Sequence, residues 1–335
     1  MIRTAILGAS GYVGGELLRL IAAHPQLVPT KLFGDRKAGQ PLGSVHPQLA
    51  TPYADKLIEP FDLEALDGVN LVFAALPHGH SQKIAPSILA RGTPFVDLGA
   101  DFRLDDAEAY QRWYGRAHVA SNLFGEFVYG IPELNRDRLR GAKAVASAGC
   151  YATAAILALQ PLVDAGLVDP KTLIVDGASG VSGAGREVKE STGFCTVTEN
   201  FSAYGLLNHR HTAEMEMALG ATVLFTPHLA PMSRGILVTC YGSARTSGDP
   251  LDVLKSAYAG EPFVHVSDQP PATKWVTGSN RVELTARRDD RTGRIVALAA
   301  IDNLVKGAAG QMIQCANLVL GLEETAGLTS IGVCP

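Results

Sequence analysis

Short apolar runs and helical periodicity alternate along the first half of the chain. Strand patterns occur at residues 4–7, 28–33, 69–76 and 94–99, and the nearly continuous apolar run at 69–76 is typical of a strand that is buried on both faces. A pattern with one apolar helical face follows the first run, over residues 16–21. Alternation of strands and helices predicts an α/β domain with a doubly wound parallel sheet.

The second half of the chain has more strand patterns and fewer helices between them. A helical pattern rich in Ala and Leu starts at residue 150 and continues to about residue 165. One further helical pattern covers residues 251–258, and strand patterns lie at 172–177, 222–229, 235–241, 281–286 and 295–301. This order predicts an α+β domain with a mixed, largely antiparallel sheet. The tail from residue 308 to about residue 322 is predicted to be a helix that is apolar all round, as in elements buried between domains or subunits.

Composition narrows the class of protein. Hydrophobic residues make up 47% of the 335 residues and charged residues 19%, and the formal net charge is −4, so we expect two globular domains and no nucleic-acid partner. Five cysteines without a CxxC spacing argue against a disulfide framework and a zinc site. We find no signal-peptide pattern and no apolar run near the ~20 residues that span a bilayer. The expectation is a cytoplasmic protein with no membrane partner.

A glycine-rich turn joins the first predicted strand to the first predicted helix. Gly8, Gly11 and Gly14 have the spacing GxxGxxG. In such a turn the first glycine permits the tight bend, the second lets backbone approach a pyrophosphate, and the third allows close packing of helix on strand. The N–H groups at the helix N-terminus then face the phosphates. The turn predicts dinucleotide binding, with a purely structural turn as the alternative.

The end of the second predicted strand is where such a domain reads the adenosine ribose. Asp35, Arg36 and Lys37 follow this strand. An acidic residue there binds the 2′-hydroxyl of NAD, whereas Arg or Lys accommodates the 2′-phosphate of NADP. We favour NADP because two cations stand side by side and Asp35 can pair with one of them. A solvated charge cluster is the alternative.

Two more loops follow predicted strands at the edge where open α/β sheets bind ligands. Pro77 and His78 come after the third strand and are predicted to contact the cofactor, although a loop-stabilising role for His78 fits as well. Arg103 comes after the fourth strand. Its guanidinium offers forked donors that match a phosphate or a carboxylate. The alternative for Arg103 is a surface ion pair with a neighbouring aspartate.

Cys150 stands where a predicted strand passes through Gly149 into the long Ala/Leu-rich helix. A cysteine in the first turn of a helix meets unpaired backbone N–H groups and the positive end of the helix dipole, and both favour the thiolate. Cys150 is therefore a candidate nucleophile. The alternative is a small buried residue that fills space at the corner, as most intracellular cysteines do.

The segment 204–214 is the densest in chemistry. His209, Arg210 and His211 stand together, with Glu214 three residues beyond, and they can supply a general acid/base, its orienting carboxylate and a substrate cation. On a strand the two histidines would share a face, whereas at a helix start they would diverge by ~200°. The sequence leaves open which of them serves. No third ligand cluster has a suitable spacing, so no metal is expected.

Seven segments occur in the order found in one enzyme family. They are residues 8–14, 101–104, 149–153, 179–186, 209–214, 226–229 and 303–307. On these segments the chain resembles the N-acetyl-γ-glutamyl-phosphate reductases of arginine biosynthesis and, more distantly, the aspartate-semialdehyde dehydrogenases. The resemblance extends from residue 4 to about residue 318.

The resemblance implies a domain arrangement and a reaction. Residues 1–149, completed by a C-terminal helix at about 308–335, would form a Rossmann-type NADP-binding domain. Residues 150–307 would form the catalytic and oligomerisation domain of a homodimer or homotetramer. Cys150 would attack an acyl phosphate, and NADPH would reduce the resulting thioester to a semialdehyde. Reductases of β-aspartyl phosphate or carrier-bound aminoadipyl phosphate, and a non-catalytic NADP-sensing regulator, are the alternatives.

Residue patterns and resemblance together give the expected site. The catalytic group comprises Cys150, His209, His211 and Glu214, and the substrate contacts are Arg103, Ser182, Tyr204 and Arg210. Ser182 belongs to a loop whose glycines and serines offer N–H and hydroxyl donors, with a flexible surface loop as the alternative. The expected cofactor contacts are Gly8, Ser10, Gly11, Tyr12, Val13, Gly14, Arg36, Lys37, Pro77 and His78 and, by resemblance alone, Gly180, Gly183 and Asn303.

Overall fold

The computed structural model of the chain describes residues 1–334, which fall into two compact units. The first unit comprises Met1–Ala148 and Ala308–Leu328. The second unit comprises Gly149–Gly307 and the tail from Thr329. Each unit has its own sheet and is described by itself below.

The helix predicted over residues 308 to about 322 is present, but it does not continue through the end of the chain. A π-helical turn (Val305–Ala309) leads into helix α11 (Gly310–Val319), which ends well before residue 335. Beyond residue 328 the chain pairs with the second unit, because the backbone N–H of Asn280 donates to the carbonyl oxygen of Thr329 at 2.8 Å. Backbone hydrogen bonds of this kind carry no side-chain signal, so the hydrophobic pattern does not reveal them.

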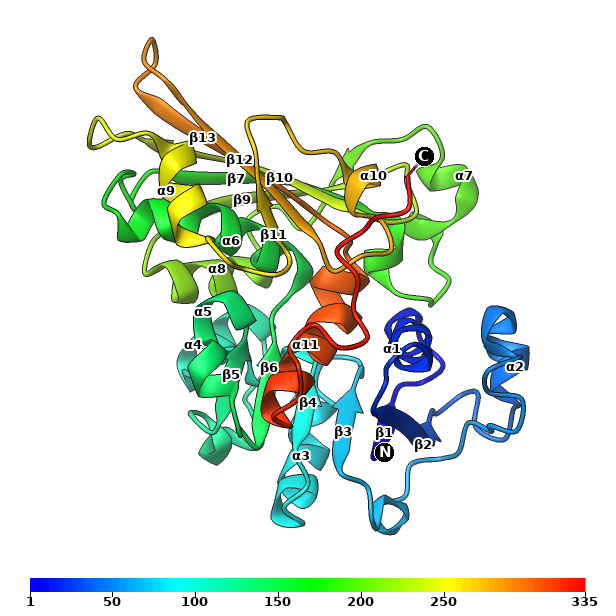
Figure 1. Ribbon diagram of the computed structural model, residues 1–335. Helices are drawn as coiled ribbons and strands as arrows, with labels where there is room; N and C mark the ends of the chain where they lie inside the picture. The colour runs from blue at the N-terminus through cyan, green and yellow to red at the C-terminus, as the bar shows by residue number, and fades with distance from the viewer. Residues whose placement is uncertain (335) are drawn as a thin grey trace. The chain divides into compact units, whose positions relative to one another are not determined.

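A six-stranded sheet in the order β2-β1-β3-β4-β6-β5 forms the centre of the first unit (Figure 1). All neighbouring strands in it are parallel. Besides α11, the elements of this unit are β1 (Ile2–Leu7), α1 (Tyr12–Ala22), β2 (Leu27–Phe33), α2 (Leu42–Val45), β3 (Leu71–Ala74), α3 (Ser81–Ala90), β4 (Phe95–Asp97), α4 (Ala107–Tyr114), β5 (Phe127–Gly130), α5 (Pro132–Leu139) and β6 (Ala144–Ser147).

Both faces of this sheet are covered, as the continuous apolar run at residues 69–76 predicted. Every residue of β3, β4 and β6 is buried. Helix α3 covers the face that carries Leu7 and Phe95, because its Ala85 and Ile88 belong to the same buried cluster. Helix α11 contacts β4 and β6 and also touches α1 and α5. Since all strands run the same way, the loops after β1, β3 and β4 meet at one edge.

A seven-stranded mixed sheet in the order β11-β12-β13-β10-β7-β9-β8 forms the centre of the second unit. Its neighbours are antiparallel except in the pairs β7–β9 and β11–β12. The elements of this unit are α6 (Cys150–Asp164), β7 (Leu173–Gly180), α7 (Phe194–Val197), β8 (Ser202–Ala203), α8 (His211–Leu219), β9 (Val223–Ala230), β10 (Ile236–Ser243), α9 (Pro250–Ala257), β11 (Val264–Val266), α10 (Thr273–Val276), β12 (Val282–Asp289) and β13 (Arg294–Ile301).

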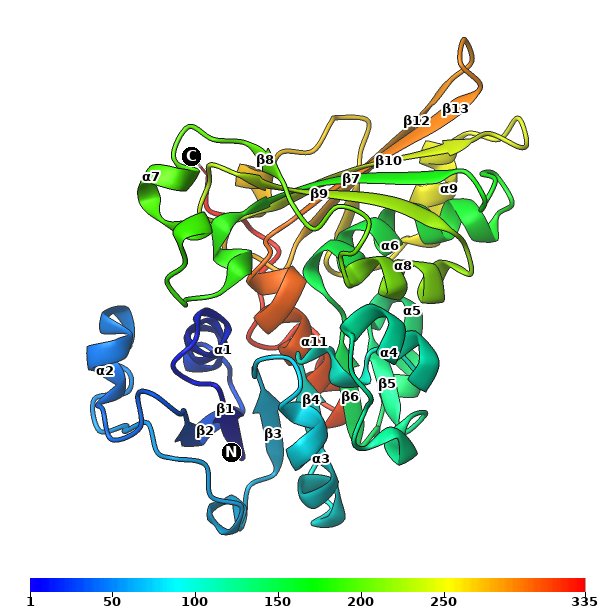
Figure 2. The same ribbon diagram turned by 180° about the vertical axis from the view of Figure 1, so that it is seen from behind.

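Helices cover one face of this second sheet. Along β7 and β10, buried and partly exposed residues alternate, which is the pattern of a sheet with one covered face. Helix α6 packs on β10 and β13 and contacts α8 and α9 (Figure 2). Nearly all of its side chains are buried, so the helix that starts at Cys150 forms the core of the unit. Across residues 1–334, no helix is long and apolar enough to cross a membrane.

Candidate active site

The glycine-rich turn of the first unit has a conformation that requires glycine. Gly8 has φ +85°, and a Cβ there would lie 2.3 Å from the carbonyl oxygen of Ala75. A Cβ at Gly14 would lie 2.3 Å from the carbonyl oxygen of Gly8. Gly11 is the N-cap of α1, which starts at Tyr12. The turn is therefore a backbone cradle in front of a helix N-terminus, which fits the pyrophosphate of a dinucleotide.

The predicted ribose-reading residues lie beside this cradle. A Cβ at Gly34, just after β2, would be 3.3 Å from Ser10 Oγ, so Ser10 of the turn packs against the end of that strand. Arg36 and Lys37 follow within three residues and are exposed. Ser10 and these two cations therefore belong to the same edge of the sheet, where the 2′-phosphate of NADP is expected.

His46 is bonded to the glycine-rich turn, and this role of His46 was not predicted from the sequence. Its Nε2 donates a hydrogen bond to the carbonyl oxygen of Ala9 at 2.9 Å. A Cβ at Gly15 would lie 2.6 Å from the His46 ring, so a glycine in the first turn of α1 makes room for it. The His46 side chain is buried, and no local pattern marks it as a partner of the glycine-rich turn.

His78 belongs to a buried network after β3 and β4. Its Nδ1 lies 2.8 Å from Oδ1 of the fully buried Asp101, and its ring lies 4.5 Å from that of Tyr114. The backbone N–H groups of Gly79 and Gln82 donate to the same carboxylate at 2.8 and 3.1 Å. Burial opposes ionisation of Asp101, but the bonds from His78 and these N–H groups lower its pKa overall. These contacts tie His78 to the loop after β4.

Arg103 is a buried cation at the carboxyl end of β4. Its side chain is 7% exposed, and Nη2 donates to the carbonyl oxygen of Leu98 at 2.6 Å. Nearby, Asp97 Oδ1 accepts bonds from Ser81 Oγ at 2.7 Å and from the N–H of Gly99 at 2.8 Å. Burial raises the pKa of Asp97 to about 7, although Arg103 acts in the opposite direction. Arg103 thus lies inside the unit and not on its surface.

In the second unit, Cys150 is the first residue of α6, with Gly149 as its N-cap (φ −68°, ψ 150°). The thiol lies at the positive end of the helix dipole and beside N–H groups that the helix itself leaves unpaired. Both features favour the thiolate. Cys150 is partly exposed, whereas Cys240 and Cys315 are buried, and burial raises the pKa of Cys240. Cys150 thus has the local environment of a reactive cysteine.

Two long-range contacts hold this corner. The N–H of Gly149 donates to Glu214 Oε2 at 2.8 Å, and the Glu214 side chain is 0% exposed. From another direction, a Cβ at Gly307 would lie 2.8 Å from the Cβ of Cys150. Glycine at position 307 therefore allows the turn after β13 to pack directly on the cysteine.

The two histidines have different surroundings. His211 opens α8, and its Nε2 lies 3.8 Å from Glu214 Oε1. The His209 ring centroid is 4.8 Å from that of His211, and His209 Nδ1 accepts the backbone N–H of His211 at 3.2 Å. Burial, followed by the neighbouring His211, lowers the pKa of His209 to about 3. His209 is therefore neutral with its proton on Nε2, whereas His211 faces a carboxylate that favours the imidazolium.

Aromatic side chains surround His209. The rings of Tyr151, Tyr204 and Phe225 lie 5.7, 5.6 and 5.3 Å from it, all edge-on. Tyr204 Oη donates to Tyr151 Oη at 3.4 Å. Burial and, to a smaller extent, the Cys150 thiolate raise the pKa of Tyr204 to about 12. Tyr204 is thus a protonated donor within electrostatic reach of Cys150.

The loop after β7 is bonded to the turn after β13. Asn303 Nδ2 donates to Ser182 Oγ at 2.9 Å, and Asn303 Oδ1 accepts the N–H of Gly235 at 2.7 Å. The N–H of Gly180 donates to the carbonyl oxygen of Gly235 at 2.8 Å. A Cβ at Gly183 would lie 3.8 Å from Asn303 Nδ2. Ser182 and the three expected cofactor contacts of this unit therefore lie together, with Asn303 and Gly180 buried. Arg210 is exposed.

Two family models match the chain in succession. The semialdehyde dehydrogenase NAD-binding domain matches residues 3–142, and the semialdehyde dehydrogenase dimerisation domain matches residues 150–303. The chain is 47% identical to N-acetyl-gamma-glutamyl-phosphate reductase of Symbiobacterium thermophilum over 99% of this chain and 98% of that protein. It is 42% identical to the same enzyme of Geobacter sulfurreducens over 100% of both. The chain belongs to the N-acetyl-γ-glutamyl-phosphate reductase family.

Solved structures of aspartate semialdehyde dehydrogenases share the fold of this reductase family member. The enzyme II of Vibrio cholerae, complexed with ASA, has a TM-score of 0.72 at 18% identity and covers 96% of this chain and 98% of its own. The enzyme of Candida albicans, solved with NADP, has a TM-score of 0.72 at 15% identity and the same coverage. At these identities the likeness concerns the fold alone.

Some residues that shape the site of this reductase family member escaped sequence reasoning. Tyr151 stands next to the nucleophile and packs on both histidines. Asp302 follows the apolar strand β13 and is 0% exposed, and an acidic residue directly after such a strand was the available signal. His46 had no signal in its own neighbourhood.

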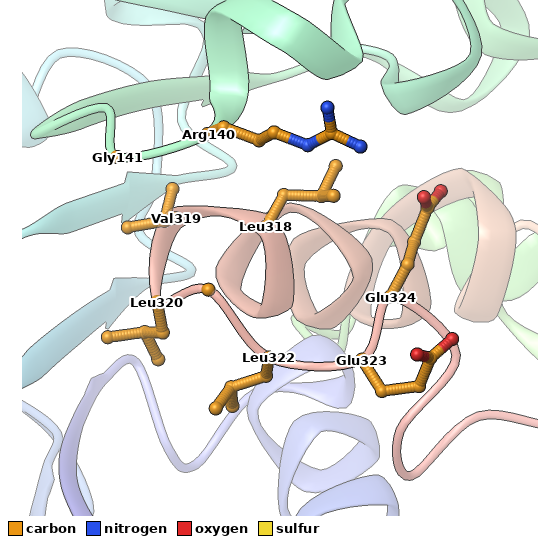
Figure 3. A pocket seen from close by; sticks show the side chains of 9 residues that line it. Arg140, Gly141, Leu318, Val319, Leu320, Leu322, Glu323 and Glu324 are labelled. Carbon is orange, nitrogen blue, oxygen red and sulfur yellow. The ribbon is translucent and has the colours of Figure 1, made fainter.

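An open pocket of about 580 Å³ lies at the end of α11 in the first unit. Figure 3 shows the apolar side chains of Leu318, Val319, Leu320 and Leu322 around the end of this helix, with Arg140 and Glu323 nearby. The pocket contains none of the expected reductase residues. Among residues 1–334, no group of three or more His, Cys, Asp or Glu side chains has an arrangement that could hold a metal ion.

Proposed function

We propose that this protein is an NADPH-dependent reductase that converts N-acetyl-γ-glutamyl phosphate to N-acetylglutamate semialdehyde and phosphate in arginine biosynthesis. The observation that carries the proposal is the corner at Cys150. The nucleophile opens a helix, and its N-cap is bonded to Glu214, whose second oxygen faces His211. Nucleophile, acid/base and orienting carboxylate are the parts that acyl transfer through a thioester requires.

Cys150 carries the acyl group in this mechanism. Its thiolate attacks the acyl-phosphate carbonyl, a C–S bond forms, and the C–O bond to phosphate breaks with the electron pair leaving on phosphate. The thioester is then reduced to a thiohemiacetal, and collapse of the thiohemiacetal releases the semialdehyde and regenerates the thiolate. The helix dipole and the N–H groups at the start of α6 stabilise the negative charge on sulfur before attack and after collapse.

The two histidines divide the remaining work. His211 acts as the general acid/base, because Glu214 faces its Nε2 and stabilises the protonated ring. It pairs with the thiolate as a cation, gives its proton to the oxyanion that forms when the thioester is reduced, and takes that proton back as the thiohemiacetal collapses. His209 stays neutral and donates through Nε2, since its Nδ1 already accepts the N–H of His211. Positioned acid/base groups contribute roughly 10²–10⁴-fold to rate.

The cofactor assigned to this mechanism is NADP. When bound, NADPH supplies the hydride that reduces the acyl group. The cradle of Gly8, Ser10, Gly11, Tyr12, Val13 and Gly14 would hold the pyrophosphate, and Arg36 and Lys37 would hold the 2′-phosphate. Gly180, Gly183 and Asn303 would border the nicotinamide end. In place of a direct contact, His78 would support the loop that contains Pro77, as its bond to Asp101 suggests.

Four polar side chains are proposed to bind the substrate. Arg103 would hold an oxyanion of the acyl phosphate, because a buried guanidinium at the carboxyl end of β4 keeps donors in a fixed fork. The exposed Arg210 would pair with the substrate carboxylate. Tyr204 and Ser182 would donate hydroxyl hydrogen bonds.

The protein is further proposed to act as a homodimer in the cytoplasm, with a homotetramer as the larger alternative. Support comes from the match to a dimerisation domain over residues 150–303 and from the second sheet, whose strands alternate buried and partly exposed residues. A sheet face with alternating exposure accepts a second copy without any new fold element.

Replacement of the nucleophile tests the function. With Cys150→Ser we expect loss of phosphate-dependent NADP reduction with N-acetylglutamate semialdehyde, because the thiolate is the acyl carrier, and unchanged NADPH binding by fluorescence titration. Lost NADPH binding with retained turnover would contradict the assignment. The same assay with aspartate semialdehyde and with carrier-bound aminoadipate semialdehyde separates the rival substrates, and the N-acetylglutamate compound is expected to react fastest.

A further inference from the structure

Asp302 is a buried carboxylate to which the mechanism above gives no role. It follows β13 directly and is 0% exposed. Its two oxygens accept a forked pair of bonds from Arg234, with Nε at 3.0 Å from Oδ2 and Nη2 at 3.1 Å from Oδ1. A bidentate pair of this kind fixes the orientation of both side chains as well as neutralising the buried charge.

The same carboxylate binds backbone from two further places. The N–H of Gly278, in the loop before β12, donates to Oδ2 at 2.6 Å. The N–H groups of Leu304 and Val305, in the turn after β13, donate to Oδ1 at 2.8 and 3.2 Å. Asp302 therefore ties together three segments that are distant in sequence: the turn before β10, the loop before β12 and the turn after β13.

Asn303 lies next to two of the contacts that Asp302 makes, the one with Arg234 and the one with the N–H of Leu304. Its carboxamide donates to Ser182 Oγ and accepts the N–H of Gly235, and the side chain is 2% exposed. Gly235 is the neighbour of Arg234, and Leu304 is the neighbour of Asn303. The Asp302 carboxylate thus holds the backbone on both sides of the Asn303 bonds.

A separate bond holds the turn on the side of the nucleophile. The main-chain carbonyl of Asp302 accepts the N–H of Gly307 at 2.9 Å, and Gly307 packs on Cys150. The side chain of Asp302 therefore controls the face toward Ser182, whereas its main chain controls the face toward Cys150. A change confined to the side chain leaves the second bond in place.

We propose that Asp302 is a positioning residue for the hydride-transfer step. With Arg234 it fixes Asn303 against Ser182, so that the loop 180–185 and Asn303 form a preshaped wall for the nicotinamide end of the cofactor. The proposal rests on the reductase function proposed above. Loss of the carboxylate slows reduction of the thioester and leaves formation of the thioester intact.

The experiment separates these two steps in three single variants. Asp302→Asn keeps the shape and removes the charge, and Arg234→Gln removes the fork from the other side. Glu324→Gln is the matched control, because Glu324 accepts a similar fork from Arg136 at 2.7 and 3.1 Å in the first unit and is not one of the proposed site residues. Phosphate release from N-acetyl-γ-glutamyl phosphate without NADPH reports acylation of Cys150, and rapid mixing with NADPH reports hydride transfer.

We expect Asp302→Asn and Arg234→Gln to release phosphate in a burst at close to the wild-type rate and to transfer hydride about 10²-fold more slowly, the size expected for a misplaced reacting partner. NADPH binding, measured by fluorescence titration, should weaken in both. The double variant should be no slower than Asp302→Asn alone, because the two side chains act as a unit. Glu324→Gln should match wild type in both steps.

Two results would overturn the positioning role. One is hydride transfer in Asp302→Asn and Arg234→Gln at the rate of Glu324→Gln. The other is a parallel loss of burst and hydride transfer, which would make the pair a general support of the unit. If Asp302→Asn does not fold, Arg234→Gln decides between the same outcomes, because the Arg234 side chain is partly exposed and its replacement disturbs the interior less. Failure of the reductase function itself is distinguishable, because then wild type would give neither burst nor NADPH oxidation.

Discussion

The glycine-rich turn at residues 8–14 (the cofactor turn) and the corner at Gly149 and Cys150 (the nucleophile corner) both join a strand to a helix that has glycine as its N-cap. They are held in place by different contacts. At the cofactor turn, Gly8 and Gly14 meet backbone of the same turn and of the adjacent strand end, at hypothetical Cβ distances of 2.3 Å. At the nucleophile corner, the N–H of Gly149 is bonded to Glu214, 65 residues further along the chain. One corner is determined by backbone sterics that only glycine satisfies, and the other by a hydrogen bond to a side-chain carboxylate.

This difference decides what a local motif can reveal. A turn that tolerates only glycine leaves its signature in the residues that form it. A corner held by side chains from other elements leaves only its nucleophile in the local sequence. The following changes test the contrast, beginning with the largest expected effect.

Gly8→Ala should destroy the cofactor turn. The added Cβ would lie 2.3 Å from the carbonyl oxygen of Ala75, and the alanine would have to adopt φ +85°. We therefore expect the affinity for NADPH, measured by fluorescence titration, to fall by more than about 100-fold. Gly39→Ala is the matched control, because Gly39 has φ +83° but nothing within 4 Å of its hypothetical Cβ. Both variants carry a strain of about 1–2 kcal/mol. Equal NADPH affinities in the two variants would refute the steric account of this turn.

Glu214→Gln should damage the nucleophile corner without removing the nucleophile. The amide can no longer stabilise a protonated His211, so we expect kcat to fall by about 100-fold with little change in the KM for NADPH. Glu216→Gln, on the same helix, is the control, since the Glu216 carboxylate accepts the backbone N–H of Val223 at 3.1 Å and is assigned no part in the mechanism. Steady-state kinetics measure kcat for both variants. Equal kcat values for Glu214→Gln and Glu216→Gln would show that the Glu214 carboxylate has no part in the mechanism.

Arg36→Ala tests whether Arg36 binds the 2′-phosphate of NADPH. A charge-assisted bond to the 2′-phosphate contributes about 1.5–3 kcal/mol, so the KM for NADPH should rise roughly tenfold or more while that for NADH changes little. Steady-state kinetics with both cofactors give the answer. Equal weakening of NADPH and NADH would show that Arg36 does not read the 2′-phosphate.

The pH dependence of the free energy of unfolding of His209→Gln tests whether His209 is neutral in the folded protein. The folded protein keeps His209 neutral because burial lowers its pKa to about 3, whereas the unfolded chain takes up a proton near pH 6.5. The unfolded state thus binds more protons between these values, and the stability contributed by neutral His209 is present above pH 6.5 and lost as pH falls. Urea unfolding should therefore show an advantage of wild type over His209→Gln that shrinks by about 2 kcal/mol from pH 7.5 to pH 5. A constant difference would place His209 in contact with solvent.

Much of the fold was predictable because long apolar runs report burial directly. The strands β1 to β4 of the first unit and the long strands β7, β9, β10, β12 and β13 coincide with predicted strand patterns to within a few residues, whereas β5 was not predicted. The two-residue β8 and the three-residue β11 escaped prediction, because strands this short are defined by the partner they pair with. The tail after residue 328 escaped for the same reason.

The site was predictable as a set of residues and not as an arrangement. The start of α6 at Cys150 followed from a helical pattern that begins there. The separate environments of His209 and His211 did not, because they depend on Phe225 and on the carboxylate of Glu214. His46 and Asp302 act on loops that lie far from them in sequence, and only the folded chain brings them together.

The central claim is that Cys150 carries the acyl group, and intact-protein mass spectrometry tests it most directly. Wild-type protein is mixed with N-acetyl-γ-glutamyl phosphate in the absence of NADPH and quenched in acid, which preserves a thioester. The account predicts an added N-acetylglutamyl group that maps to the peptide containing Cys150, disappears on addition of NADPH, and is absent from Cys150→Ala. Full turnover without any adduct on Cys150, or an adduct on another cysteine, would contradict it.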